Sequence, residues 1–479
     1  METRERTEER AARAAHDSET PPNLRAFMTG DWIETPLPLS AIPNRDRFAQ
    51  RRQALSRAFP GATLIVPAGE ERVRANDTHF RYRPSSDFAY LAGGPAEPRS
   101  VLVLESGGAG YRSLLFVPAH NRGEAASYND RVAGELWVGR HRGVPESQIF
   151  FGVDETRPQS ELDDYLESLS AAGREVAAVR GLDRRVDGKF DRTERDSDLQ
   201  RHLAEMRLFK DRSEIEELRR CVEITKRGFE DVIRVLPRAA SEREIEAAFW
   251  RRARIEANDV GYLTIAASGE HACTLHWTKN GGTLRKEDLL LLDAGVEAES
   301  LYTADITRTL PISGRFSTEQ RAGYEIVHEA QRAAFGKVRP GNDFLEPNRA
   351  AMLVLTEGLR DLGILRCSVE EALDEENQFY RRYTLHNVSH MLGLDVHDCA
   401  TARAEKYRHG KLQQGMALTV EPGLYFQIDD ASVPDRFRGI GVRIEDDVVV
   451  TADGHENLSA IIPSAADAVE TWMAELQKS

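Results

Sequence analysis

The sequence has none of the long apolar runs that mark membrane proteins. A membrane-spanning helix needs about 18 apolar residues in a row, and no run approaches that length, so we expect no membrane contact. The opening residues, METRERTEERAARAAHDSET, are charged throughout and have no apolar centre, so we expect no secretory signal. We expect residues 1–30 to form a disordered tail.

Cysteine is scarce and scattered. Only four cysteines occur, and none of them forms a CxxC pair. A zinc knuckle or a disulfide framework needs closely spaced or paired cysteines, so neither is expected. We interpret Cys221, Cys273, Cys367 and Cys399 as reduced, mostly buried thiols of a cytoplasmic protein.

Several common motifs and a basic charge are also missing. The sequence has no GxxxxGKS/T, no GxGxxG after a strand, no GxSxG and no HExxH, which argues against the nucleotide-binding and hydrolytic classes that use them. The net charge of −15 argues against a nucleic-acid partner, because phosphate binding requires basic patches.

The chain is long enough for more than one domain. Its 479 residues suggest roughly two to three domains. Strand-like runs such as ATLIVPA, RSVLVLES and RSLLFVPA alternate with helical pieces, which predicts an α/β domain over residues 31–204. A long amphipathic helix follows, and helices then mix with short apolar strands, which predicts an α+β domain over residues 205–465. Residues 466–479 are expected to be a C-terminal tail.

Two aspartates lie in or beside segments that read as buried strand. Asp293 follows the apolar run Leu289 to Leu292, and Asp305 comes 12 residues later. A buried ionised carboxylate is strongly disfavoured, so each must be exposed, protonated, matched with a cation or bound to metal. An extended chain would hold the two about 40 Å apart at ~3.3 Å per residue. We therefore expect a hairpin around Glu297 to Ser300.

Three other apolar segments carry groups that suit a metal site. They supply His386, His390 and His397 in TLHNVSHMLGLDVHD, Glu421 in ALTVEPGLY, and Arg443 and Glu445 in GIGVRIEDDVVVT. Four carboxylates together would repel, by roughly 4 kcal/mol for each pair 4 Å apart at an effective dielectric near 20. Two divalent ions remove that repulsion. An oxygen-rich shell with one imidazole favours manganese or another hard ion.

Each residue taken alone has a simpler interpretation. Single aspartates often cap helices or turns, and histidines at i and i+4 often share a helix face or lie satisfied in a core. Glu421 before proline could end a strand, and Glu445 before DD could belong to a solvated turn. Only the complete set, in the order Asp, Asp, His, Glu, Glu, favours a metal site.

This order and its flanking words resemble a known family. The words DITRT, HMLGLDVHD, LTVEPGLY and GVRIEDD, between about residues 205 and 460, are similar to those of the aminopeptidase P and prolidase metallopeptidases. The resemblance implies a pita-bread catalytic domain. The N-terminal part, with SSDFAYLAG, resembles the creatinase-like domain that precedes it in that family.

The resemblance also implies roles for individual residues. Asp293 would bind one metal, Asp305 and Glu445 would bridge two, and His390 with Glu421 would complete the other. His276 in LHWTKN, His386 and His397 would line the substrate site and stabilise the tetrahedral intermediate. Arg443 would fix Asp305 or a neighbouring ligand, and Glu421 is the candidate to accept a proton from water.

The implied activity is release of the first residue from peptides with proline second. A prolidase, which cleaves only Xaa-Pro dipeptides, remains the alternative, because the same metal cluster serves both. A non-catalytic pita-bread interaction module is a further alternative, although all five ligand positions are filled. The family's use of neighbouring N-terminal domains also implies a homo-oligomer, either a dimer or a tetramer.

Two departures from the family's pattern need an explanation. The spacing from Asp293 to Asp305 is one residue longer than is common, so we expect the extra residue in the hairpin loop or in a bulge. Asn387 replaces a usual glycine, and asparagine tolerates a left-handed backbone. Neither change removes a ligand.

Overall fold

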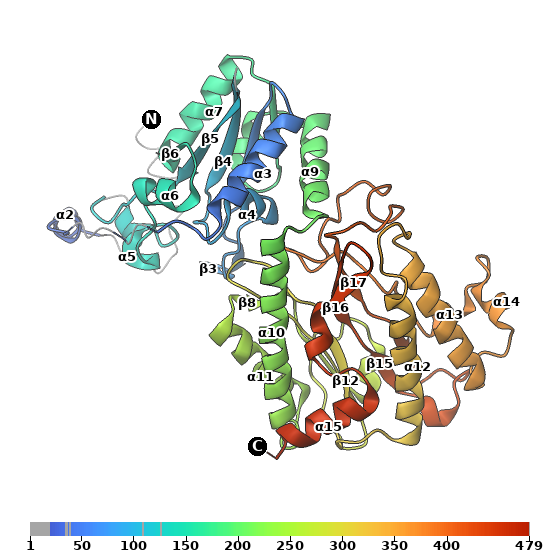
Figure 1. Cartoon of the computed structure of the whole chain (residues 1–479). Helices are drawn as coiled ribbons and strands as arrows, with labels where there is room; N and C mark the ends of the chain where they lie inside the picture. Colours follow the sequence, from blue (N-terminus) through green and yellow to red (C-terminus); the bar gives the residue numbers. More distant parts are fainter. Residues whose placement is uncertain (1–19, 34–36, 38–39, 108–109, 125–126, 479) are drawn as a thin grey trace.

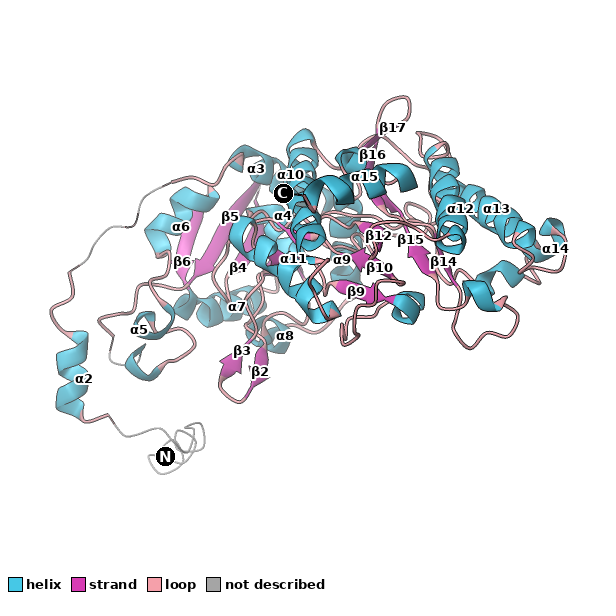
Figure 2. Ribbon diagram, turned by 90° about the horizontal axis from the view of Figure 1, so that it is seen from below, coloured by secondary structure: helices cyan, strands magenta, loops and turns pink. Residues whose placement is uncertain are grey.

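The computed structural model describes residues 20–33, 37, 40–107, 110–124 and 127–478 (Figure 1). It contains a smaller N-terminal domain and a larger C-terminal domain, which lie side by side in both views (Figures 1 and 2). Within this described part of the chain, no helix has both the length and the hydropathy that a membrane crossing requires.

The N-terminal domain is built on a mixed five-stranded sheet with the order β6-β5-β4-β1-β7. Strand β1 pairs antiparallel with β4 and parallel with β7, and β5 pairs antiparallel with β4 and parallel with β6. The strands are β1 (Thr63–Pro67), β4 (Val101–Gly107), β5 (Gly110–Val117), β6 (Glu155–Pro158) and β7 (Val176–Ala178). The three apolar runs noted in the sequence are β1, β4 and β5, which confirms the expected α/β architecture.

Both faces of this sheet are covered, which explains why its central strands are apolar at successive positions. Ile65 packs with residues of α7 and α8 on one face, whereas Leu64 and Val66 belong to the core on the other face. The helices of the domain are α2 (Pro22–Thr29), α3 (Arg45–Ala58), α4 (Ser86–Ala92), α5 (Glu135–Val138), α6 (Val144–Phe151), α7 (Leu162–Ala171), α8 (Arg184–Lys189) and α9 (Glu194–Arg207). A small hairpin, β2 (Val73–Ala75) and β3 (Thr78–His79), lies near the C-terminal domain (Figure 1).

The C-terminal domain pairs long helices with small antiparallel sheets. Its helices are α10 (Arg212–Val235), α11 (Glu242–Glu256), α12 (Thr318–Phe335), α13 (Glu346–Asp361), α14 (Val369–Leu373) and α15 (Ala466–Leu476). Its strands are β8 (Asp259–Val260), β9 (Ile265–Ser268), β10 (Leu289–Asp293), β11 (Val296–Glu297), β12 (Thr307–Pro311), β13 (Ala417–Val420), β14 (Gly423–Tyr425), β15 (Gly441–Arg443), β16 (Asp446–Val450) and β17 (His455–Asn457). The sheets β12-β10-β9 and β13-β16-β17 meet at a bridge between Thr307 and Glu445.

The junction between the domains lies at residues 208–211, between α9 and α10. The predicted boundary at residue 205 falls in the last turn of α9. Helix α10 starts at a capping box, in which Asp211 accepts from the Glu214 amide and Glu214 accepts from the Asp211 amide. One hydrophobic core runs across the junction, from Leu55 of α3 to Leu218 of α10 and Trp472 of α15.

Both predicted tails differ from what the structure shows. Residues 1–19 lie outside the described residues, but Pro22–Thr29 forms α2, which starts with proline in its first turn and buries no residue. Residues 466–476 form α15, which packs against α10 and α12. Its buried Val469, Trp472 and Met473 follow the i, i+3, i+4 pattern of an amphipathic helix.

All four cysteines are free thiols, as expected. Cys221, Cys273 and Cys399 are buried, and Cys367 is half-buried. Burial raises the pKa of the Cys221 thiol, which keeps it protonated and unreactive at neutral pH.

Candidate active site

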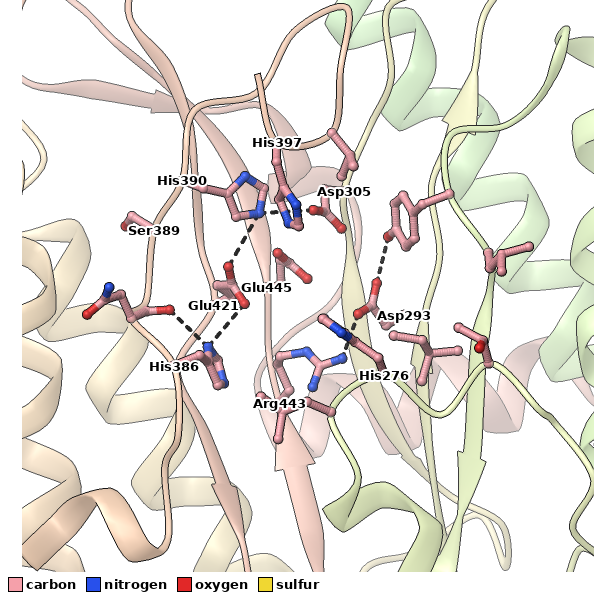
Figure 3. Close-up of a pocket in the computed structure, with 17 residues that line it drawn as sticks. His276, Asp293, Asp305, His386, Ser389, His390, His397, Glu421, Arg443 and Glu445 are labelled. Carbon is pink, nitrogen blue, oxygen red and sulfur yellow. Dashed lines mark hydrogen bonds and ion pairs between the residues drawn. The ribbon is translucent and has the colours of Figure 1, made fainter. Parts of the chain in front are cut away.

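The nine candidate residues from the sequence line one cavity of about 570 Å³ (Figure 3). They are His276, Asp293, Asp305, His386, His390, His397, Glu421, Arg443 and Glu445. Apolar side chains complete the wall, among them Leu263, Ile265, Leu275 and Val396. Residues from widely separated words of the sequence therefore meet in one place.

A hairpin brings the two aspartates together, as predicted. Asp293 ends β10 and pairs with Thr307 of β12, while the amide of Ala294 donates to the carbonyl of Ile306 at 3.0 Å. Asp305 precedes β12 and enters the cavity from the neighbouring strand. Folding back replaces the long extended separation with adjacency.

The hairpin between the aspartates closes through a short loop around residues 299–301. The register of Asp293 with Thr307 continues without a shift through the bridge between Glu297 and Thr303. At the tip the amide of Leu301 donates to the carbonyl of Ala298, and Leu301 has a positive φ of 69°. A turn followed by a left-handed residue is a common three-residue hairpin connection, in which the left-handed residue forms a bulge next to the loop.

His390 lies between carboxylates. Its Nε2 atom is 3.2 Å from Oδ2 of Asp305 and 3.4 Å from Oε1 of Glu421. Asp305, His390 and Glu445 each offer one ligand atom, and these atoms lie within 4.8 Å of one another. Oxygen and imidazole donors at this spacing can hold a divalent cation.

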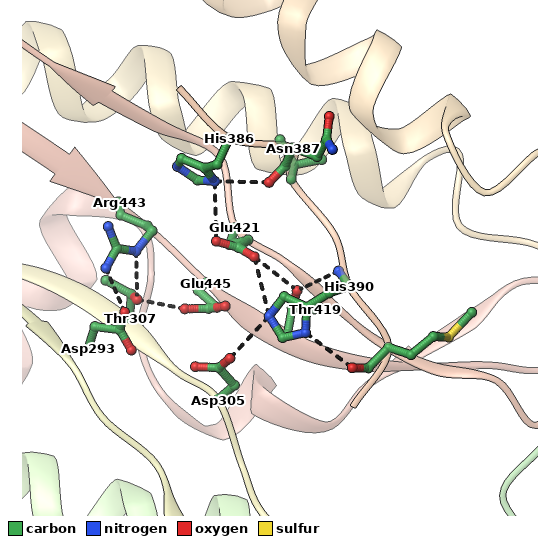
Figure 4. A network of polar contacts seen from close by, with 12 residues as sticks. Asp293, Asp305, Thr307, His386, Asn387, His390, Thr419, Glu421, Arg443 and Glu445 are labelled. Atoms are coloured by element: carbon green, nitrogen blue, oxygen red, sulfur yellow. Dashed lines mark hydrogen bonds and ion pairs between the residues drawn. The ribbon is translucent and has the colours of Figure 1, made fainter. Parts of the chain in front are cut away.

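Glu421 directly follows β13 and contacts two histidines (Figure 4). Its Oε2 atom is 3.3 Å from Nδ1 of His386, and its Oε1 atom accepts a hydrogen bond from the Thr419 hydroxyl at 3.3 Å. Burial tends to raise the pKa of Glu421, but the hydrogen bond with His386 and the histidine charges lower it to about 2. Glu421 is thus a carboxylate at neutral pH.

Arg443 holds Asp293 rather than Asp305. Its Nη2 atom donates to Oδ2 of Asp293 at 2.5 Å, and the Tyr262 hydroxyl donates to Oδ1 at 2.6 Å. Arg443 also donates to the Tyr425 hydroxyl at 3.0 Å. The sequence left open whether Arg443 fixes Asp305 or a neighbouring ligand, and in the structure its partner is Asp293. Each Asp293 oxygen keeps a second lone pair for another partner.

The cluster carries more negative charge than its own cations balance. Burial and the charges of Asp305 and Glu421 raise the pKa of Glu445 well above its ordinary value. Burial also raises the pKa of Asp305. Burial tends to lower the pKa of His390, but its hydrogen bond with Asp305 and the charge of Glu421 raise it to about 9. A bound cation would relieve this repulsion, so the donor set fits divalent metal.

The remaining two histidines face the same cavity. The ring of His397 meets the ring of His390 edge-on, with centroids 4.4 Å apart. Burial and the nearby His390 charge lower the pKa of His397. His276 also lines the cavity (Figure 3).

Two of the simpler interpretations do not fit the structure. His386 and His390 lie in an irregular segment, so they do not share a helix face. Glu445, Asp446 and Asp447 are all buried, so they do not form a solvated turn. Glu421 does follow the end of a strand, and it also lines the cavity.

The suggestion that Asn387 takes the place of a glycine in a left-handed backbone conformation is wrong. Asn387 does not have a positive φ, so the replacement of glycine there requires no left-handed residue.

Four functional neighbours escaped the sequence reasoning. Thr307 donates to Glu445 at 2.6 Å, and Asp447 accepts from the Asp305 amide at 3.2 Å. Tyr425 contacts Arg443 and His386, and Tyr262 contacts Asp293. Thr307, Tyr425 and Asp447 stand inside or beside the quoted words DITRT, LTVEPGLY and GVRIEDD. Their motif positions were a signal, but their partners depend on the fold.

Known proteins resemble this chain over most of its length. The chain is 47% identical to Xaa-Pro aminopeptidase 1 of Streptomyces coelicolor, over 95% of this chain and 92% of the relative. It is 36% identical to the Xaa-Pro aminopeptidase of Escherichia coli, over 91% of this chain and 99% of the relative. The solved structure of a Pseudomonas aeruginosa aminopeptidase superposes with a TM-score of 0.81 at 34% identity, covering 92% of this chain and all of that one.

The two domains match two described families. Residues 48–177 match the aminopeptidase P N-terminal domain, and residues 216–452 match metallopeptidase family M24. Aminopeptidase P from E. coli with the inhibitor Pro-Leu also superposes with a TM-score of 0.81, at 34% identity over 92% of this chain and all of that one. The expected pita-bread domain and its creatinase-like partner are thereby confirmed, and the chain belongs to the M24 metallopeptidases that carry an aminopeptidase P N-terminal domain.

Proposed function

We propose that this chain is an Xaa-Pro aminopeptidase, which hydrolyses the bond before a proline in second position and releases the first residue. The observation that carries the proposal is the convergence of all nine candidate residues on one cavity. The names of the relatives reported above support an aminopeptidase over a prolidase. The filled ligand positions argue against a non-catalytic interaction module.

Two divalent ions would be held by five side chains. They are Asp293, Asp305, His390, Glu421 and Glu445, with Asp305 and Glu445 in the bridging positions. When bound, such a pair of ions lowers the pKa of a water molecule and polarises the substrate carbonyl. Manganese is the proposed metal, because four of the five donors are carboxylates.

The protein's own groups would handle the protons and the oxyanion. Glu421, ionised at neutral pH, accepts a proton from the attacking water and passes it to the proline nitrogen as the peptide bond breaks. His276, His386 and His397 face the reacting carbonyl and stabilise the negative charge that develops on its oxygen. Arg443 and Tyr262 keep Asp293 in place.

Substrate choice would follow from the two ends of the cavity. The acidic cluster near Asp293 attracts a free amino terminus, which favours removal of a single residue over internal cleavage. The histidines frame a short space for a pyrrolidine ring. We further propose that the protein is cytoplasmic and works as a homo-oligomer. Light scattering of the active protein can test the oligomeric state.

The test compares three peptides with manganese-loaded protein. Xaa-Pro-Xaa, its N-acetylated form and Xaa-Ala-Xaa are incubated separately, and release of the first residue is followed by mass spectrometry. A misplacement of 1 Å can cost ~10²-fold in rate, so the second and third peptides should be cleaved far more slowly. A Glu421→Gln variant purified in the same way controls for contaminating host peptidases.

Equal cleavage of all three peptides would show that the proline-specific proposal is wrong. An Xaa-Pro dipeptide is incubated in parallel, and cleavage of the dipeptide without cleavage of Xaa-Pro-Xaa would instead identify a prolidase.

A further inference from the structure

A segment of the N-terminal domain reaches the loop that carries His397. Arg83 precedes α4 and donates from Nη2 to the backbone carbonyl of Leu394 at 2.5 Å. Its Nε atom donates to Oε2 of Glu297, at the tip of the β10–β12 hairpin, also at 2.5 Å. One guanidinium thus ties the N-terminal domain to strand β11 and to the His397 loop of the catalytic domain.

The next contact comes from the first turn of α4. The hydroxyl of Ser86 donates to Oδ1 of Asp395 at 2.6 Å, and Nη1 of Arg83 donates to the same hydroxyl oxygen at 3.1 Å. Asp395 is only two residues before His397. The bond to Ser86 therefore restrains the loop close to the histidine.

A buried relay holds the other side of the histidine. Asp87 pairs with Arg207 of α9, and Nε of Arg207 donates to Oδ1 of Asp398 at 2.9 Å. Asp398 is 1% exposed, and its Oδ2 accepts from the amide of Leu394 at 3.2 Å. The carboxylate after His397 thus closes the loop on itself and anchors it to the domain junction.

These contacts surround a short loop of irregular backbone. Residues 392–398 have no helix or strand of their own to fix the direction of His397. The amide of Thr303 donates to the carbonyl of Gly393 at 3.0 Å, which adds a restraint from the hairpin. Without the N-terminal domain, the loop would keep the hydrogen bond from Thr303 to Gly393. It would lose the bond from Arg83 to Leu394 and the bond from Ser86 to Asp395.

We propose that Arg83, Ser86 and Asp87 of the N-terminal domain are positioning residues for His397. They touch neither the cavity nor the substrate, and they act by fixing the loop on both sides of the histidine. The inference rests on the proposed role of His397 in stabilising the oxyanion. It assigns the N-terminal domain a part in the chemistry of the chain to which it belongs.

The test uses the full-length protein and a double-mutant cycle. Arg83→Ala should lower kcat by ~10- to 100-fold with metal content unchanged, because a small displacement of a group acting in the transition state costs rate. In a His397→Ala background the same substitution should change kcat by less than about twofold, because the group that it positions is gone. A merely structural role would lower kcat equally in both backgrounds, and that result would overturn the proposal.

Arg81→Ala is the matched control. Arg81 pairs with Asp259 at 3.0 Å, so it also links the two domains, but it does not contact the His397 loop. Its loss should leave kcat within about twofold of the wild type, since exposed ion pairs contribute little. A drop in kcat equal to that of Arg83→Ala would mean that any weakened domain contact suffices, which contradicts a specific role.

Two further measurements cover other failures. If Arg83→Ala does not fold, Ser86→Ala is the second variant. It removes the bond to Asp395 and the acceptor for Nη1 of Arg83, but it keeps the Arg83 bonds to Glu297 and Leu394. It should show a smaller fall in kcat with the same dependence on His397. Hydrogen exchange of residues 391–399 tests the loop without any substrate. Faster exchange in Arg83→Ala than in Arg81→Ala supports the proposal, and equal exchange overturns it, even if the wild type cleaves no Xaa-Pro peptide.

Discussion

Arg443 donates a hydrogen bond to Asp293 over 2.5 Å, inside the cavity and across 150 residues of chain. Both side chains are buried, so each leaves an unbalanced charge if the other is removed. The pair thus couples β15 to the end of β10 at the point where the substrate amine is proposed to lie.

Removing Arg443 should therefore be most harmful when no metal is bound. Loss of one partner from a buried ion pair costs about 3–5 kcal/mol, and a cation on Asp293 would replace part of the lost charge. Urea unfolding of Arg443→Ala should show a larger loss of stability in chelator-treated protein than in metal-loaded protein. Arg180→Ala breaks the buried pair with Asp196 in the N-terminal domain and should show equal losses in both states. Equal losses for Arg443→Ala would contradict metal binding at Asp293.

Alanine at Asp305 or Glu445 should abolish the binding of both ions, together with turnover. A bridging carboxylate neutralises two ions at once, so its loss leaves each of them short of a ligand. Metal analysis after gentle purification gives the stoichiometry. Asp430→Ala removes a buried carboxylate that does not line the cavity, and this variant should keep both ions. Two ions and full activity in either bridging variant would show the assignment to be incorrect.

Manganese should reactivate the chelator-treated protein better than zinc at equal free-ion concentration. The proposed donors are four carboxylates and one imidazole, and such oxygen-rich sites favour the harder ion. Turnover of Xaa-Pro-Xaa measured in metal buffers gives the comparison. A reproducible preference for zinc would count against the argument from donor type.

Acid should release a contact between α9 and the loop at residues 403–406. Hydrogen bonds from Arg403 and Lys406 lower the pKa of Glu205 to about 2, from its ordinary value of 4.5. The stabilisation is therefore present above pH 4.5 and is lost as the pH falls toward 2. The difference in Tm between metal-free wild type and Glu205→Gln should be constant above pH 5 and shrink below pH 4.5. A difference that stays the same down to pH 3 would mean that this carboxylate is not paired in solution.

The sequence was most informative where chemistry and burial conflict. Carboxylates beside apolar runs, such as Asp293 after Leu289 to Leu292, had to be exposed, protonated, matched with a cation or bound to metal, and the structure places them in one cavity. The hairpin followed from the spacing of Asp293 and Asp305 alone. The identity of each ligand's partner did not follow, because Tyr262 and Asp447 reach Asp293 and Asp305 only through sheet pairing between distant segments.

The missed helix at the C-terminal end and the missed contacts between the domains have different causes. Helix α15 carries a clear helical spacing of Val469, Trp472 and Met473, so this signal was present and was not used. Contacts such as that of Arg83 with Leu394 could not be predicted, because they depend on how the two domains pack against each other.

One hydrophobic core contains both Leu55 of the N-terminal domain and Trp472 of α15, and this limits where the chain can be cut into fragments. The side chain of Leu301, at the hairpin tip, lies close to Gly94 of the N-terminal domain. A recombinant fragment that begins at α10 would expose to water the apolar residues of this core that the N-terminal domain covers, and it is expected to aggregate. The same constraint applies in evolution: an N-terminal domain can be exchanged for another only if the new domain matches the shape of this apolar surface.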